Sequence, residues 1–316
     1  MTETAQGSTI ALLIPAYNAA RWLPRLLESA HAQTEPFDSI WVYDDCSTDD
    51  TAAVAGTHGA RVLRGAVNKG CSAGKNALAA HVESDYLHFH DADDELLPNF
   101  VELARKWIDR GAPDVVLFDY LYKDNDSGAL LGTSHFEADE LAADPRRYAI
   151  RRQINSICGL YRRSAYLAAG GYDEGPAVLY NEDVAFHIKL AFAGLSFGAE
   201  NEVSIVNYRI GGSMSGANQH KCLLAHHEVM QRALARPDSG PYRQEIAAKL
   251  WAVAGRLAAC GDWDEANRAA QTAAPIAPPD ATAGSAAFRA LARLDPTGAL
   301  RLRERWVRFA KPRLRT

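Results

Sequence analysis

The sequence has few cysteines, no long apolar run and no large excess of charge of one sign. Its five cysteines are scattered over 316 residues, and no two of them form a C-x-x-C pair. Neither a disulfide framework nor a thiolate zinc site is indicated, and a reducing cytoplasm fits best. The formal net charge of −5 argues against non-specific binding of nucleic acid by the whole molecule.

The N-terminus also lacks the basic start of a secretory signal. Its first apolar run, residues 10–14, is far shorter than the roughly 20 residues of a membrane-spanning helix. Any membrane contact is therefore expected to be peripheral. The composition, 47% hydrophobic and 23% charged, is that of a globular protein with material for two domains. Residues 1–8 are predicted to be a disordered N-terminus.

From residue 9 onward, short apolar runs alternate with amphipathic stretches. Four runs are predicted strands: TIALLI, SIWVYD, ARVLRG and DYLHFH. Helices are predicted to start at Ala19, Thr48, Ser72 and Leu97. Buried strands separated by helices are typical of a mostly parallel sheet with right-handed crossovers. We therefore predict an α/β fold, which binds ligands at the carboxyl ends of its strands.

The last hundred residues have a different character. GGSMSG at 211–216 predicts a flexible break, and the sequence after it is rich in alanine and helical in period. We predict a separate α-helical C-terminal region over residues 216–316. It ends in a basic tail, LRLRERWVRFAKPRLRT.

In this tail Leu302, Trp306 and Phe309 fall at i, i+4 and i+7, so a helix here would carry an apolar stripe beside a basic flank. Two interpretations stay open. The segment is either a solvated tail that docks through its aromatic side chains, or a peripheral contact with anionic lipid headgroups.

Polar residues follow each of the four predicted strands. In chain order they are Tyr17, Asn18, Asp44, Asp45, Asn68, Asp91 and Asp93. A turn and a helix cap explain one acid in WVYDDCSTDDT, but explain two poorly. A carboxylate there would accept a hydrogen bond from a pyrimidine N–H, a contact that favours uracil or thymine.

NKGCSAGKNAL, residues 68–78, is a glycine-rich turn into a helix. Only three residues separate Gly70 from Gly74, and Asn76 follows Lys75, so the P-loop pattern is not met and an ATPase of that kind is excluded. A turn of this kind with Lys75 in the first helical turn would suit an anionic diphosphate. A plain turn with a solvated lysine explains the same residues equally well.

YLHFHDADDELLP places four acids within five positions: Asp91, Asp93, Asp94 and Glu95. Crowded carboxylates are costly unless a cation neutralises them. Asp91 and Asp93 at a strand end predict a Mg²⁺ or Mn²⁺ site that stays open to substrate phosphates. Asp94 and Glu95 are expected to open the following helix.

Two further segments contain titratable residues. His88 and His90 point away from Asp91 along the strand and are predicted to be packed or hydrogen-bonded, rather than metal ligands. In YNEDVAFHIKLAFAG, Asn181 is a predicted N-cap, with Glu182 and Asp183 in the first helical turn. Taken alone, these acids would only stabilise a helix start.

Six segments in order resemble the inverting nucleotide-sugar glycosyltransferases of family 2. They are IPAYNAARWLPRLLESAHAQ, VYDDCSTDDT, NKGCSAGKNAL, FHDADDEL, YRRSAYLAAGGYDE and NEDVAFHIKLAFAG. The resemblance covers residues 9–215. It implies the GT-A fold, a Rossmann-like α/β domain with a nucleotide-binding half and an acceptor-binding half. Residues 216–316 lie outside it.

The resemblance implies a role for each matching residue. Asp91 and Asp93 would hold a Mn²⁺ or Mg²⁺ ion with the diphosphate. Asp183 would be the catalytic base, with Glu182 beside it. The nucleotide would contact Pro15, Ala16, Tyr17, Asn18, Asp44, Asp45, Asn68, Lys75 and Asp91.

Two positions depart from the family pattern. Lys75 stands where the family often has an arginine, which gives up bidentate geometry. Ile210 stands where many relatives have a histidine after Tyr-Arg. If that histidine holds metal or phosphate, another group, such as His220, must do so here.

The function these features predict is metal-dependent, inverting transfer of a sugar from a UDP-sugar, or a dTDP-sugar, to the hydroxyl of a carbohydrate or lipid-linked acceptor. The product would be a polysaccharide, such as one of the cell envelope, a glycolipid or another glycoconjugate. The protein is expected in the cytoplasm or at the inner face of the membrane. The alternative is a non-catalytic nucleotide-sugar-binding or scaffold protein. A nucleotidyltransferase would need a basic glycine-rich loop after the first strand, and PAYNAARW is not one.

Overall fold

The structure is a computed structural model that describes residues 7–211, 217–279 and 285–311. The chain divides into two compact units. The first comprises Met1–Pro145, Ile154–Glu174 and Lys189–Ser213, and the second comprises Arg146–Gln153, Gly175–Ile188 and Met214–Thr316. Nearly all of the predicted break at 211–216, and most of the predicted disordered N-terminus, lie outside the described residues.

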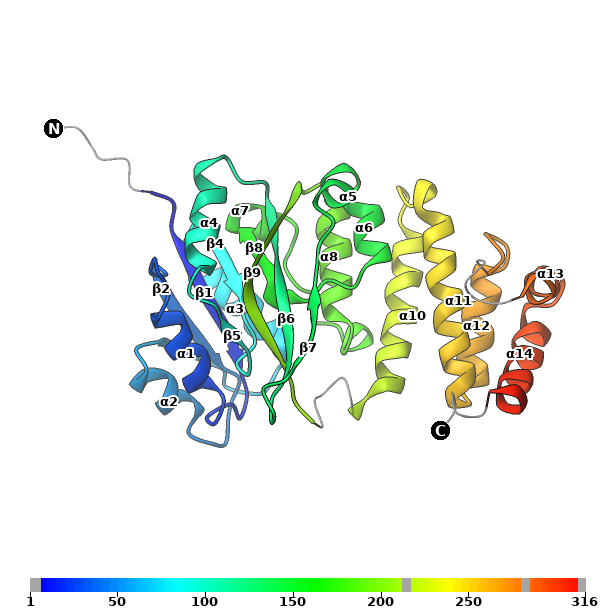
Figure 1. The fold of residues 1–316 in the computed structure, drawn as a ribbon, viewed down its shortest axis with the longest axis horizontal. Helices are drawn as coiled ribbons and strands as arrows, with labels where there is room; N and C mark the ends of the chain where they lie inside the picture. Colours follow the sequence, from blue (N-terminus) through cyan, green and yellow to red (C-terminus); the bar gives the residue numbers. More distant parts are fainter. Residues whose placement is uncertain (1–6, 212–216, 280–284, 312–316) are drawn as a thin grey trace. The chain divides into compact units, whose positions relative to one another are not determined.

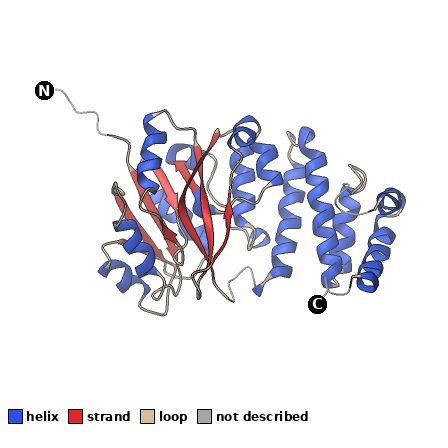
Figure 2. Cartoon of the chain, viewed as in Figure 1, coloured by secondary structure: helices blue, strands red, loops and turns tan. Residues whose placement is uncertain are grey.

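The first unit is built on a nine-stranded sheet (Figures 1 and 2). Its strands are β1 (Ile10–Ala16), β2 (Ser39–Asp44), β3 (Arg61–Arg64), β4 (Tyr86–Phe89), β5 (Glu95–Leu96), β6 (Val115–Asp124), β7 (Leu130–Ser134), β8 (Gly159–Arg162) and β9 (Phe197–Arg209). Their order is β3-β2-β1-β4-β8-β6-β9-β5, with β7 paired to β6. Strands β1, β2, β3, β4, β6 and β9 run in one direction, and β5, β7 and β8 run in the other.

Helices cover both faces of this sheet (Figure 1). On one face lie α1 (Leu23–His31), α2 (Thr51–Thr57) and α4 (Phe100–Asp109), and on the other lie α3 (Cys71–His81) and α7 (Arg163–Ala168). A short helix, α5 (Ala138–Ala143), packs against β9. The sheet is therefore buried on both sides, which is why its central strands are apolar throughout.

The core of the first unit forms where helix stripes meet this sheet. Residues 10–14 of β1 are fully buried, and Leu23, Leu26 and Leu27 give α1 an apolar stripe at helical spacing. The rings of His88 and Phe100 lie 4.1 Å apart. His88 Nδ1 lies 2.9 Å from Gly159 O, and His88 Nε2 lies 3.0 Å from His90 Nδ1. Both histidines are fully buried, so the prediction that they are packed and hydrogen-bonded is confirmed.

The second unit is helical in the part that the structure describes. Its helices are α6 (Pro145–Arg151), most of α8 (Glu182–Phe192), α10 (Gln219–Ala235), α11 (Arg243–Cys260), α12 (Trp263–Ala273), α13 (Ala286–Leu294) and α14 (Pro296–Ala310). Gly261, at φ 86°, ends α11 in the left-handed conformation that favours glycine. Asp262 then caps α12 by accepting a hydrogen bond from Glu265 N. Leu223, Val253 and Leu257 form the centre of the core between these helices.

The predicted α/β fold with a mostly parallel sheet and a helical C-terminal region is confirmed. One local prediction is wrong: Asp94 and Glu95 do not open a helix. Glu95 and Leu96 instead form β5, which pairs with Ile205 and Val206 of β9, and α4 begins only at Phe100. Among the helices in the described ranges, none is long and apolar enough to cross a membrane.

Candidate active site

The carboxyl ends of β1 to β4 meet at one edge of the sheet, because these four strands are parallel. In the register, Ala16 lies beside Asp44, and Asp44 lies beside Arg64. The turns that follow the strands are therefore neighbours. The predicted site residues of the first unit lie in these turns or at the last residues of β1 and β2, except Lys75, which lies on α3. Open α/β sheets bind their ligands at this edge.

The two acids after β2 shape this edge. Asp45, buried to 4% exposure, accepts hydrogen bonds from Lys69 N (2.9 Å) and Gly70 N (2.7 Å). Asp44 accepts from Ser47 N (3.0 Å), and its other oxygen lies 3.3 Å from Arg64 Nε. Since a carboxylate has about four lone-pair positions, these bonds leave Asp45 able to accept one from a base.

The turn after β1 is joined to the turn after β2. Asn18 has a positive φ of 49°, and its side-chain oxygen accepts from Thr48 N at 2.9 Å. Tyr17 is 52% exposed, whereas Ala16 is buried. Pro15 is half-buried and Asn68 is exposed. Asn18 thus holds the turn together, and Tyr17 has a ring face that is open to a ligand.

Lys75 on α3 is a buried cation at this edge, with 2% exposure. Its Nζ donates a hydrogen bond to Ser156 Oγ (2.6 Å), and it lies 3.7 Å from Asp91 Oδ1 and 4.9 Å from the centre of the Tyr172 ring. A solvated lysine, one of the two interpretations of this segment, is therefore wrong. The lysine instead faces the first acid of the turn after β4.

Asp91 and Asp93 lie together in the turn after β4. The Asp91 side chain is 37% exposed. Burial, with the neighbouring Asp91 carboxylate adding to it, raises the pKa of Asp93 to about 6. Arg25 on α1 donates to the backbone oxygen of Asp93 and, at 3.0 Å, to Asn125 Oδ1. The turn is thus tied to the end of β6.

Asp94 points into the protein and not toward a metal position. Its two oxygens accept from Asn207 Nδ2 and Tyr208 N, both at 2.7 Å, so it holds the turn against β9. Burial first, and then the carboxylates of Asp93 and Asp91, raise the pKa of Asp94 well above its usual value. Glu95 accepts from the Tyr208 hydroxyl at 2.6 Å.

The residues of this turn fit a hard divalent ion with few protein ligands. Within residues 7–211, 217–279 and 285–311, no three His, Cys, Asp or Glu side chains are grouped so as to hold a metal. Asp91 and Asp93 offer oxygen ligands only, and Asp94 is engaged elsewhere. Mg²⁺ and Mn²⁺ accept such a set, because water and substrate phosphates complete their coordination.

Asp183 and Glu182 occupy the first turn of α8 and belong to the second unit. Their placement toward the acids of the first unit stays a prediction. Asn181 precedes α8, and its backbone oxygen accepts a hydrogen bond from Ala185 N at 3.1 Å, as at an N-cap position. Its side-chain Oδ1 lies 2.9 Å from His226 Nδ1, and its role as a side-chain cap stays a prediction. His220, the suggested replacement for a missing histidine, lies 2.8 Å from Asp262 Oδ2 within the second unit.

The segment YRRSAYLAAGGYDE is joined to α3 by Arg163, which donates to Ala79 O at 3.0 Å, and by the side chain of Asn76. Asn76 Oδ1 accepts from Tyr172 N (2.8 Å) and from the Tyr166 hydroxyl (2.7 Å). Gly171 has a φ of 56°, and a Cβ there would lie 2.4 Å from Asn76 Oδ1. Glycine is therefore required, and this contact brings Tyr172 over Lys75.

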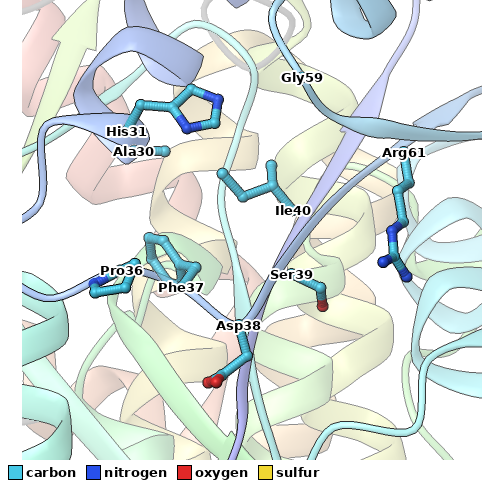
Figure 3. A pocket seen from close by; sticks show the side chains of 9 residues that line it. All are labelled: Ala30, His31, Pro36, Phe37, Asp38, Ser39, Ile40, Gly59 and Arg61. Carbon is cyan, nitrogen blue, oxygen red and sulfur yellow. The ribbon is translucent and has the colours of Figure 1, made fainter.

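The cavities of the first unit include two of several hundred cubic ångströms. One of about 280 Å³ lies beside Phe37, His31 and Arg61 (Figure 3). It adjoins the amino ends of β2 and β3 and so lies at the edge opposite the acids. The other, of about 420 Å³, is lined by Tyr122, Asp124, Leu131, Arg209, Ile210 and Gly211. It directly follows the stretch of β9 that binds Asp94.

Sequence reasoning missed Ser156 and Arg25. Both act on site residues that are far away in the chain: Ser156 on Lys75, and Arg25 on the turn after β4. Neither lies in a pattern that distinguishes it from an ordinary polar residue. Only the folded chain brings them to the site.

The sheet order, the helical layers and the acid turn at the sheet edge define a glycosyltransferase of the GT-A fold. Residues 11–167 match the family model "Glycosyl transferase family 2". The chain belongs to this family, as the six ordered segments indicated, and it is a glycosyltransferase.

Named relatives agree with this assignment. The succinoglycan biosynthesis protein ExoU of Rhizobium meliloti (strain 1021) is 27% identical over 252 residues, which is 73% of this chain and 71% of that protein. S. aureus TarS 1–349 in complex with UDP-GlcNAc has a similar fold, with a TM-score of 0.72 and 17% identity, over 96% of this chain and 92% of that one. The mannosyltransferase PcManGT from Pyrobaculum calidifontis, in complex with GDP-Man and Mn²⁺, has a TM-score of 0.60 and 17% identity, over 96% and 88%.

Proposed function

We propose that this glycosyltransferase moves a sugar from a UDP-sugar to an acceptor hydroxyl, with inversion and with the help of Mn²⁺ or Mg²⁺. The observation that carries the proposal is the position of Lys75. Its buried Nζ lies 3.7 Å from Asp91 Oδ1 at the edge of the sheet where ligands bind, and Asp93 lies in the same turn as Asp91. A cation next to paired acids suits a diphosphate that arrives with a divalent ion.

Two observations support a UDP-sugar as the proposed donor. Asp45 retains acceptor capacity for a pyrimidine N–H, which favours uracil or thymine. TarS, of similar fold, is known with UDP-GlcNAc. PcManGT is known with a guanine nucleotide and Mn²⁺, which supports the metal and leaves the base to be tested. A dTDP-sugar is the alternative donor.

The proposed reaction breaks the bond between the anomeric carbon and the diphosphate oxygen, and it forms a bond from that carbon to the acceptor oxygen. Asp183, with Glu182 beside it, would take the proton of the acceptor hydroxyl as this oxygen attacks from the opposite face. Lys75 would offset part of the charge that builds on the leaving diphosphate. A bound divalent ion would supply Lewis-acid stabilisation of the same charge.

The proposed acceptor is a carbohydrate or a lipid-linked saccharide. ExoU, which this chain matches over 73% of its length, is named for succinoglycan biosynthesis, which supports a role in polysaccharide synthesis such as that of the cell envelope. The five cysteines form no disulfide, which suits a reducing cytoplasm. A peripheral membrane contact through the C-terminal segment completes the proposal.

Hydrolysis of UDP-sugar with and without added Mn²⁺ tests this function. We expect activity that needs the metal and that is lost in Asp93→Ala and Asp183→Asn. Asp109→Asn is a matched control, because Asp109 is exposed at the end of α4. Full activity in both site variants would contradict the assigned roles. A larger thermal shift with dTDP than with UDP would indicate that the donor is a dTDP-sugar.

A further inference from the structure

The outer face of α14 carries apolar side chains where an exposed helix is ordinarily polar. Leu302, Trp306 and Phe309 are 59%, 54% and 89% exposed, and they lie on one side of the helix. We call these three residues the α14 stripe. Phe309 is the most exposed large apolar side chain of the residues that the structure describes. Neighbouring exposed apolar side chains of this kind are typical of an interaction surface.

The stripe is exposed because the opposite face of α14 is firmly packed. Ala299, Leu300 and Val307 are buried, and α14 packs against α11 and α12 (Figure 1). Glu304 is buried and pairs with Arg308 at 2.9 Å. Asp295 caps the helix by accepting a hydrogen bond from Gly298 N at 2.8 Å. The helix is therefore fixed with its stripe turned outward, and the prediction that the aromatic side chains dock the tail is wrong.

A basic flank runs beside the stripe. Arg301 and Arg305 are exposed. At 100° per residue, they lie about a quarter turn round the helix from the α14 stripe. In the described ranges neither guanidinium lies within ion-pair distance of a carboxylate. Lys311 Nζ lies 5.6 Å from the centre of the Trp306 ring, which adds a third cation. Exposed cations beside aromatic and leucine side chains are typical of helices that lie in a membrane interface.

We propose that the α14 stripe, with Arg301 and Arg305, docks on a membrane surface that carries anionic lipid headgroups. The apolar side chains would enter the boundary between headgroups and acyl chains, and the guanidinium groups would pair with lipid phosphates. A second copy of this chain is a poorer partner, since two such faces would bring their arginines together. Glu304, the one acid of α14, is already paired and buried.

This inference deepens the proposed membrane contact and does not depend on the chemistry at Asp91 and Asp93. Flotation of the full-length protein with phosphatidylcholine vesicles, with and without phosphatidylglycerol, tests it. We expect binding that requires phosphatidylglycerol and weakens as NaCl is added. Arg301→Gln with Arg305→Gln should weaken binding about thirtyfold, because each basic residue contributes about 1 kcal/mol at such a surface. Trp306→Ser with Phe309→Ser should abolish it.

Two controls have comparable chemistry on other surfaces. Arg110 is exposed after α4, and Leu167 on α7 is 41% exposed, so Arg110→Gln and Leu167→Ser should bind as the wild type does. UDP-sugar hydrolysis in buffer without vesicles should be unchanged in all of these variants, which separates a failure here from a failure of the proposed function. Absence of wild-type binding to phosphatidylglycerol vesicles would overturn the proposal. The proposal would also be overturned if light scattering showed that the wild type is a dimer and that the double variant Trp306→Ser, Phe309→Ser is a monomer.

Discussion

The sheet edge that carries Asp45, Lys75 and the turn after β4 is called the acid edge here. The acid edge and the outer face of α14 reverse the usual distribution of side chains in opposite ways. At the acid edge charged groups are buried: Lys75, Asp45 and Asp94 are at most 4% exposed. On α14 aromatic groups are exposed, with Phe309 at 89%. Buried charge and contiguous exposed apolar surface are the informative exceptions in a folded protein.

The difference lies in how each exception is compensated. Every buried charge at the acid edge has partners in the protein, such as Lys69 N and Gly70 N for Asp45. The side chains of the α14 stripe are instead more than half exposed. The acid edge is thus organised by the protein itself, as the proposed binding of a small ligand requires, whereas the stripe fits the proposed contact with a surface.

The largest effect is expected at Asp93. Asp93→Ala should lower kcat/KM for UDP-sugar hydrolysis about a thousandfold, because it removes a proposed ligand of the ion that would stabilise the leaving diphosphate. Thermal melting should stay the same or rise, since the half-buried carboxylates of Asp93 and Asp91 repel each other. If the variant loses activity only in proportion to a loss of folded protein, Asp93 is structural.

The second-largest effect is expected for Lys75→Met. The change removes a buried cation from Ser156 and Asp91, and it should weaken UDP binding in the presence of Mn²⁺ about ten- to a hundredfold, the worth of a charge-assisted hydrogen bond. Isothermal titration calorimetry would measure it. Lys69→Met is the matched control, because Lys69 is exposed in the turn that leads into α3. Equal effects of the two substitutions would show that general positive charge matters, and not the position of Lys75.

Asp94→Ala should affect stability rather than binding. Asn207 Nδ2 and Tyr208 N would lose their acceptor, which costs about 1–3 kcal/mol of unfolding free energy. Denaturant unfolding would measure the loss. The Mn²⁺ dependence of UDP binding should remain. If that dependence disappears as in Asp93→Ala, Asp94 is a metal ligand and its bonds to β9 must rearrange.

The smallest effect on stability is expected on the outer face of α14, a helix that has one exposed and one buried apolar face. Phe309→Ser should change the unfolding free energy by no more than about 0.5 kcal/mol. Leu300→Ala, on the buried face, should cost about 2 kcal/mol or more. Chemical denaturation of both variants would compare them directly. A large loss in Phe309→Ser would show that this ring packs against the protein in solution.

Much of the first unit could be predicted because its signals are local. The run SIWVYD gave the bounds of β2 correctly, and the four strand–helix pairs before residue 110 all exist. Strand β5 could not be found, because two residues have no periodicity. The antiparallel pairing of β8 with β4 and β6 joins segments that are distant in the chain, and no local pattern encodes it.

The site shows the same limit. The acid pair and the glycine-rich turn are visible in the sequence, but the burial of Lys75 depends on Ser156 and Tyr172, about 80 and 97 positions away. On α14 the spacing predicted an apolar stripe correctly. It could not show which side would be buried, because Leu300 and Val307 form a competing stripe at a similar spacing.

A crystal structure of the protein soaked with UDP and Mn²⁺ tests the central claim most directly. The account predicts manganese bound by Asp91 or Asp93 at roughly 2 Å, with both phosphates of UDP on the ion and within reach of Lys75. UDP bound elsewhere, with the carboxylates of Asp91 and Asp93 free of metal, would contradict it.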